Sequence, residues 1–141
     1  MIYLLDTNVV SELRKPRPHG AVVAWRRSLP VHQIAIPGVV VAEAQAGIEL
    51  TRRQDPSRAS LLESWLDDVV RYYTILPADA AIYREWARLM HGKSADLAGD
   101  AMIAATARIH HLIVVTRNLR HFTPFQVDVF NPFAYGCKEA D

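Results

Sequence analysis

Short apolar runs that end abruptly in polar residues are the feature that most constrains this fold. Residues 2–5 form a continuous apolar run that stops at Asp6, and residues 112–115 form a second run that stops at Thr116. Neither run has helical spacing, so each predicts a short buried strand. Three further segments are predicted as strands: 34–36, 74–76 and 127–129.

Helical stretches separate these predicted strands. Asp55 followed by Pro56 is a typical helix start, and the apolar residues up to Tyr73 recur at helical spacing. Four other helices are predicted, at residues 21–28, 39–52, 80–90 and 101–110. Because parallel strands need long crossovers, this alternation predicts an α/β fold with a mostly parallel sheet. In such sheets the active crevice lies beyond the carboxyl ends of the strands, which directs attention to Asp6 and residues 116–118.

Length and composition predict one domain spanning residues 1–141, with no linker or repeat. The single cysteine, Cys137, excludes an intrachain disulfide and favours a reducing compartment. The first apolar run is too short for a signal peptide or a membrane span, so we expect a cytoplasmic protein without a membrane partner. A net charge of +1 gives no general sign of a nucleic-acid binder.

Glu43 is predicted to lie inside an apolar stripe of its helix. Its neighbours at helical spacing are Val39, Val40, Ala46, Gly47 and Leu50. A buried carboxylate needs a cation or hydrogen-bond donors, so this position demands an explanation. The simpler alternative is an ion pair with Arg52 or Arg117.

Asp100 is predicted to face the sheet, because Ile103, Ala104 and Ala107 share its face of the helix. The alternative for Asp100 and for Asp6 is a helix cap or a turn. All three acids together are better explained if they converge on a shared cation. With no cysteine or paired histidines at zinc spacing, oxygen ligands favour Mg²⁺ or Mn²⁺, which usually accompany phosphoryl transfer.

The sequence resembles the PIN-domain ribonucleases, and in particular the VapC-like toxins of toxin–antitoxin pairs. The matching segments are Leu-Leu-Asp-Thr-Asn-Val at 4–9, Ser11-Glu12, Val-Ala-Glu at 41–43 with Gly47, Asp-Ala-Met-Ile-Ala-Ala-Thr-Ala at 100–107, Val-Thr-Arg-Asn at 115–118 and Asn-Pro-Phe at 131–133. Each segment alone is weakly specific, but their order and separations along nearly the whole chain are specific.

The resemblance implies an α/β/α sandwich, metal-dependent endonucleolytic cleavage of RNA, homodimerisation, and inhibition by a cognate VapB-like antitoxin. Asp6, Glu43 and Asp100 then occupy the positions of the metal-binding acids, while Thr116 and Asn118 occupy a fourth site motif. Asn118 stands where many relatives have aspartate, and His121 stands where an acid is frequent. Fewer carboxylates imply weaker binding of a second metal ion.

Basic residues offer weaker indications. The groups at 14–17, 26–27 and 52–53 are interpreted as solvated surface, whereas Arg117 and Arg120 follow the active strand and are candidates for phosphate contacts. The three tryptophans, Trp25, Trp65 and Trp86, are interpreted as core or interface residues rather than platforms for base stacking.

Two other functions fit parts of the sequence. A phosphatase would use Asp6 as its nucleophile, but Asn8 stands where such enzymes need a second acid. A catalytically weakened module that only binds RNA or an antitoxin would explain Asn118 and His121, but not the retention of the three acids. A dinucleotide-binding dehydrogenase is disfavoured, because no glycine-rich turn follows the first strand.

Overall fold

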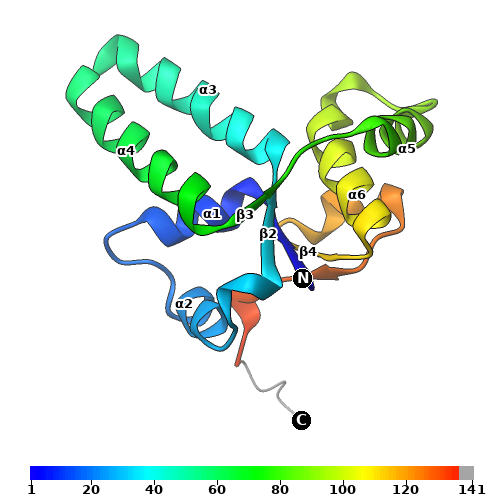
Figure 1. Cartoon of the computed structure of the whole chain (residues 1–141), viewed down its shortest axis with the longest axis horizontal. Helices are drawn as coiled ribbons and strands as arrows, with labels where there is room; N and C mark the ends of the chain where they lie inside the picture. The colour runs from blue at the N-terminus through cyan, green and yellow to red at the C-terminus, as the bar shows by residue number, and fades with distance from the viewer. Residues whose placement is uncertain (137–141) are drawn as a thin grey trace.

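The computed structural model describes residues 1–136 and contains a parallel five-stranded sheet flanked by helices (Figure 1). The strands are β1 (Tyr3–Leu5), β2 (Ile34–Pro37), β3 (Thr74–Leu76), β4 (Ile113–Val115) and β5 (Val129–Phe130), in the order β3-β2-β1-β4-β5. Every strand pair is parallel, which confirms the predicted α/β class. Cys137 lies outside the described residues.

Six α-helices connect the strands within residues 1–136. They are α1 (Thr7–Arg14), α2 (Gly20–Arg27), α3 (Gly38–Gln54), α4 (Pro56–Tyr72), α5 (Ala80–Met90) and α6 (Ala98–His110). Four 3₁₀ turns accompany them: η1 (Val31–Gln33), η2 (Ala95–Leu97), η3 (Leu119–Phe125) and η4 (Pro132–Ala134). No helix in this part of the chain combines the length and apolar character needed to cross a membrane.

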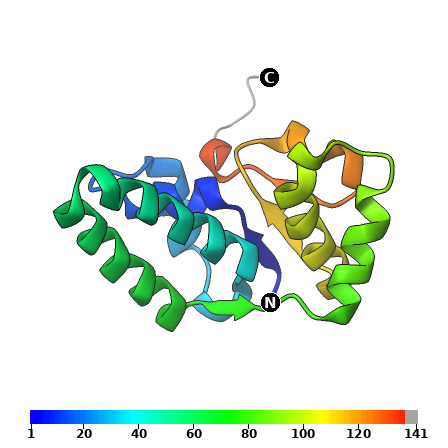
Figure 2. The same cartoon turned by 90° about the horizontal axis from the view of Figure 1, so that it is seen from above.

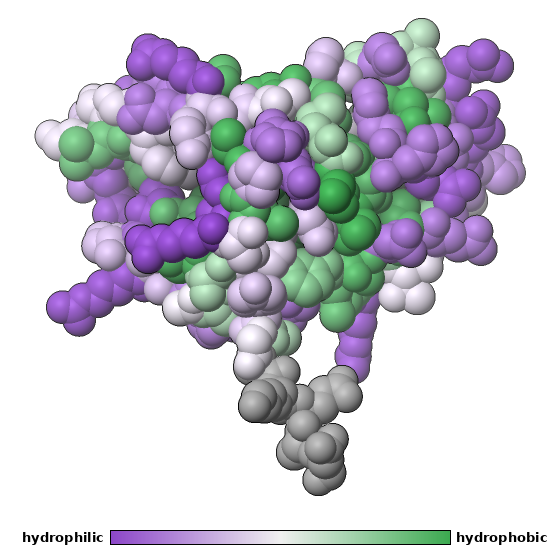
Figure 3. Space-filling view, turned by 60° about the horizontal axis from the view of Figure 1, so that its bottom comes forward, coloured by the Kyte–Doolittle hydropathy of each residue, from purple (hydrophilic) through white to green (hydrophobic). Residues whose placement is uncertain are grey.

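Figures 1 and 2 show how the helices divide into two groups. The long helices α3 and α4 lie side by side and project from one side of the sheet, whereas α5 and α6 pack together on the other. The face in Figure 3 carries strongly hydrophilic side chains at both sides and hydrophobic residues between them. The carboxyl ends of the central strands lie between the two helical groups.

The predicted elements were largely confirmed, with three differences. Helix α1 was not predicted, because its eight residues are too few to show a helical period and include the buried Val9 and Val10. Helix α6 begins at Ala98, so Asp100 lies within its first turn instead of preceding it. The last strand is β5, shifted toward the carboxyl end of the predicted segment 127–129, because β4 pairs with Val129 and Phe130.

The core forms around the central strands and confirms the interpretation of the tryptophans. Leu4, Leu5 and Val115 are fully buried, as the continuous apolar runs predicted. Trp25 is also buried and packs edge-on against Tyr3, with ring centroids 5.4 Å apart. Trp65 and Trp86 are partly buried against the same core. Burial on both faces holds β1 and β4 rigidly, and the polar residues that follow them are fixed in place.

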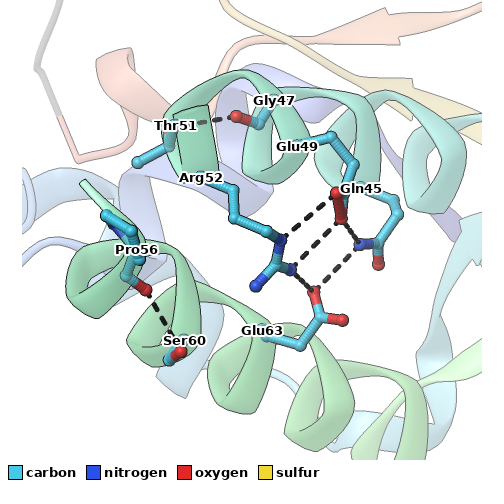
Figure 4. A network of polar contacts seen from close by, with 8 residues as sticks. All are labelled: Gln45, Gly47, Glu49, Thr51, Arg52, Pro56, Ser60 and Glu63. Carbon is cyan, nitrogen blue, oxygen red and sulfur yellow. Dashed lines mark hydrogen bonds and ion pairs between the residues drawn. The ribbon is translucent and has the colours of Figure 1, made fainter. Parts of the chain in front are cut away.

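A polar cluster joins the projecting helices α3 and α4 (Figure 4). The guanidinium of Arg52 contacts the carboxylates of Glu49 and Glu63 at 3.1 and 3.4 Å, and Gln45 donates to both acids. At the turn between the helices, Asp55 accepts a hydrogen bond from the backbone N–H of Arg58 at 3.1 Å and caps α4, as predicted. Arg52 is thus engaged within the α3–α4 pair.

Candidate active site

The candidate site lies where the adjacent strands β1 and β4 end. The backbone N–H of Asp6 donates to the carbonyl of Val115 at 2.9 Å, so Asp6 and Thr116 follow the two strands side by side. From β1 the chain continues to β2 on one side, while β4 lies on the other, which makes this edge a topological switch point. The predicted meeting of the two segments is confirmed.

The carboxylate of Asp6 is held by three donors. Thr116 Oγ1 donates to it at 2.8 Å, the backbone N–H of Thr7 at 2.7 Å and Asn8 Nδ2 at 3.2 Å. Asp6 is the N-cap of α1, so the capping alternative describes one of its contacts. A cap needs only the Thr7 contact to Oδ1, whereas here Oδ2 also accepts from the side chains of Asn8 and Thr116, which follow β1 and β4.

Asn8 joins the two strand ends and was not predicted as a site residue. Its amide nitrogen donates to Asp6 and to Thr116 Oγ1, and its Oδ1 accepts the backbone N–H of Arg117 at 3.1 Å. The sequence signal was its position two residues after Asp6. The amide can donate and accept at once, which neither a carboxylate nor an aliphatic side chain would do here.

Thr116 and Asn118 occupy different environments. Thr116 is fully buried, and its hydroxyl accepts the backbone N–H of Asn118 at 3.0 Å while donating to Asp6. Asn118 is exposed, and its side chain makes no hydrogen bond within residues 1–136. Thr116 therefore orients Asp6 directly, whereas the Asn118 side chain is free to contact a ligand.

Asp100 extends from the first turn of α6 toward the other acids. Burial raises the pKa of its carboxyl group, as do the negative charges of Asp6 and Glu43, while His121 lowers it. The His121 Nδ1 lies 3.5 Å from Asp100 Oδ2. The N-cap of α6 is Leu97 and makes no side-chain cap hydrogen bond, so Asp100 is not the cap, although as the acid of the first turn it is favoured by the helix dipole. The raised pKa of Asp100 therefore reflects its burial first and the nearby carboxylate of Asp6 second.

The predicted apolar stripe around Glu43 is wrong. Glu43 is exposed, Leu50 is 66% exposed, and the buried residues of α3 are Val40 and Ile48. The stripe failed because α3 packs mainly against α4 as it projects from the sheet, so a different face is covered. Burial does not explain the presence of Glu43.

Contacts to neighbouring elements nevertheless place Glu43 at the site. Thr7 Oγ1 donates to Glu43 Oε2, and Glu43 Oε1 lies 2.8 Å from the position that a Cβ would take at Gly99. Gly99 directly precedes Asp100 on α6. The absence of a side chain at Gly99 therefore lets the Glu43 carboxylate approach this helix.

Neither arginine proposed as a partner of Glu43 pairs with it. Arg52 binds Glu49 and Glu63 in the α3–α4 cluster, and Arg117 lies over the Phe133 ring at 4.6 Å. Within residues 1–136, no lysine or arginine pairs with Asp6, Glu43 or Asp100. The three carboxylates thus lack neutralising basic side chains.

The donors fit a hard divalent cation by their chemistry, since they are carboxylate oxygens with uncompensated charge. Across the described part of the chain, no three His, Cys, Asp or Glu side chains already stand at the positions of metal ligands. The Glu43 carboxylate is turned to Thr7. Binding a cation would require the Glu43 side chain to rotate away from Thr7. Its exposed position permits this rotation.

Comparisons with known proteins agree with this geometry. Residues 3–123 match the PIN domain family. The chain is 39% identical to Toxin FitB of Neisseria gonorrhoeae over 92% of this chain and 97% of that protein, and 33% identical to VapC ribonuclease Y4jK of Sinorhizobium fredii over 92% and 96%. The crystal structure of FitAcB from Neisseria gonorrhoeae superimposes with a TM-score of 0.82 at 35% identity, covering 94% of this chain and 99% of that one. The chain therefore belongs to the PIN-domain family.

Proposed function

We propose that this chain is an endoribonuclease that hydrolyses RNA phosphodiester bonds with a divalent metal ion and acts as the toxin of a toxin–antitoxin pair. The observation that carries the proposal is the group of carboxylates from Asp6, Glu43 and Asp100 at the ends of β1 and β4, without arginine or lysine partners. Relatives named as a toxin and as a VapC ribonuclease support it.

Asp6, Glu43 and Asp100 would hold the cation, and we propose Mg²⁺ or Mn²⁺ because all these ligands are oxygens. When bound, such an ion polarises the phosphate and lowers the pKa of an attacking water. The chain's own contribution is orientation. Thr116 and Asn8 fix the Asp6 carboxylate, whereas the Glu43 carboxylate would turn from Thr7 toward the cation.

Two positions set this site apart from an all-carboxylate one. We propose that the exposed Asn118 side chain orients the substrate or water, supported by its place directly after Arg117 at the end of β4. His121 stands beside Asp100 where a further acid is frequent in similar sequences, which favours one metal ion over two. An imidazole adds no negative charge to attract a second cation.

The phosphatase alternative is less well supported by the site. Asn8 uses its amide nitrogen on Asp6 and Thr116 and its oxygen on the backbone of Arg117. A carboxamide is also not acidic enough to deliver a proton to a leaving group. The weakened-module alternative remains distinguishable by metal binding, because a module without catalysis has no need of the cation.

The remaining parts of the proposal concern organisation. We propose one PIN-like domain over residues 1–141, supported by the family match over residues 3–123. A cognate VapB-like antitoxin as partner is supported by likeness to the structure of FitAB bound to an IR36 DNA fragment, at 34% identity and a TM-score of 0.80. Homodimerisation follows from the family resemblance, and a cytoplasmic location is supported by the lone cysteine.

Removing either central acid tests the proposal. Asp6→Asn and Asp100→Asn should each lower Mn²⁺-dependent cleavage of RNA by purified protein by more than about 100-fold. A loss of this size exceeds the effect of removing a residue that only hydrogen-bonds to a metal ligand. Asp67→Asn on the exposed side of α4 is the matched control and should cleave normally. Unchanged cleavage by both site variants would refute the nuclease function.

The raised pKa of Asp100 predicts a cost to stability in the absence of metal. Protonated Asp100 stabilises the fold fully below the ordinary pKa of 3.8, and this contribution is lost as pH rises through the raised pKa of the folded state. Asp100→Asn should therefore melt at a higher temperature than the wild type at about pH 7 in EDTA. The gain should shrink toward about pH 4; a lower melting temperature at neutral pH would contradict this.

Gly99 tests whether Glu43 must approach α6. In Gly99→Ala the new methyl group would overlap Glu43 Oε1 and push the carboxylate away. Alanine favours a helix over glycine by up to about 1 kcal/mol, so the fold should not be weakened. We expect reduced cleavage with an unchanged or raised melting temperature. Gly136→Ala would not serve as a control because of its positive φ, whereas Gly20→Ala at the start of α2, with open space at the Cβ, would.

A further inference from the structure

A groove runs away from the candidate active site between α1, α3 and α4. It has a volume of about 250 Å³, begins at Thr7 and Glu43, and extends to Arg14 and Arg58. Gly47 on α3 lines it between these ends. The acids of the candidate site and the arginines thus border one continuous depression.

The two arginines of this groove lack carboxylate partners. Within residues 1–136, Arg52, Arg71, Arg88 and Arg108 all form ion pairs with glutamate or aspartate, and so does Lys15, but neither Arg14 nor Arg58 does. The guanidinium of Arg14 instead lies over the Trp65 ring, 5.8 Å from its centroid. Arg14 is therefore held in the groove by an aromatic face and keeps its charge without a carboxylate partner among residues 1–136.

The separation along α1 decides what Arg14 can contact. Thr7 and Arg14 are the first and last residues of this helix, so about 10 Å separates them along its axis. Arg14 therefore starts about two helical turns from the acids. It is well placed for another phosphate of the same strand.

We propose that this groove binds the RNA strand flanking the scissile bond, with Arg14 and Arg58 contacting its phosphates. The inference rests on the proposed function, since it takes RNA as the substrate. Grooves for single-stranded nucleic acid combine basic side chains along the backbone with apolar and aromatic surface, and here Leu62 and Trp65 supply that surface. Trp65 supports Arg14 instead of stacking on a base. The sequence interpretation of residues 14–17 as solvated surface is revised for Arg14 alone.

The salt dependence of RNA binding tests the two contacts. Fluorescence anisotropy with a labelled single-stranded RNA is measured in EDTA over a range of salt concentrations, for wild type, Arg14→Gln, Arg58→Gln and the double variant. Each phosphate contact contributes about 0.7 to the slope of log K against log salt for single strands, so the double variant should lose about 1.4.

Arg84→Gln is the matched control, because Arg84 is exposed on α5, away from the groove, and has no ion pair within residues 1–136. It changes net charge by the same amount as each groove variant. A double variant with a slope no different from that of Arg84→Gln would overturn the proposal. So would an unchanged RNA slope combined with lost binding of a poly-glutamate peptide, which would assign the groove to an acidic protein.

A second variant tests the groove without altering charge. A Cβ at Gly47 would meet nothing within 4 Å, so Gly47→Leu would project into the groove, and leucine is a better helix former than glycine. We expect several-fold weaker RNA binding with no fall in melting temperature. Unchanged RNA affinity in this variant would show that the strand takes another path.

Binding in EDTA does not depend on cleavage, so the two proposals fail separately. If the arginine double variant has the reduced salt slope but Asp6→Asn and Asp100→Asn still cleave RNA normally, the nuclease function is refuted and the RNA groove is retained. If the salt slope is unchanged but both acid variants lose cleavage, the nuclease function is retained and the groove is refuted.

Discussion

The parallel pairing of β1 with β4 is the constraint on which the rest of the site depends. Leu5 lies opposite Val115, and the backbone N–H of Asp6 closes the pair by donating to the Val115 carbonyl. One residue of slippage would turn Asp6 or Thr116 to the other face of the sheet. Because both strands are buried, this register is fixed, and a carboxylate and a hydroxyl more than one hundred positions apart meet at 2.8 Å.

Around this fixed pair, the fold concentrates negative charge that its own basic residues do not neutralise. Helix α6 contributes Asp100 and α3 contributes Glu43. Burial, together with the negative charges of Asp6 and Glu43, raises the pKa of Asp100. Such an arrangement costs stability in the absence of a counter-charge. Other acids of the described residues also lack ion pairs, but the carboxylates of Asp6, Glu43 and Asp100 act on one another. Their proximity without a basic partner is the property of the site that a bound cation would compensate.

The sequence predicted the strands well because continuous apolar runs have few alternatives, and polar residues at their ends located Asp6 and Thr116. It predicted Asp100 on the correct face of its helix. Glu43 was included for a wrong reason, since helical periodicity could not show that α3 packs mainly on α4. The short helix α1 was not predicted. The hydrogen bonds by which Asn8 joins the two strand ends were therefore not predicted either. The groove near Arg14 depends on three helices meeting, which no local pattern reveals.

The central claim, that Asp6, Glu43 and Asp100 share one divalent cation, is tested most directly by calorimetric titration of the purified protein with Mn²⁺. The account predicts saturable binding to the wild type and strongly weakened binding to the variant Asp6→Asn/Asp100→Asn. Equal Mn²⁺ affinity in the wild type and in this double variant would contradict it.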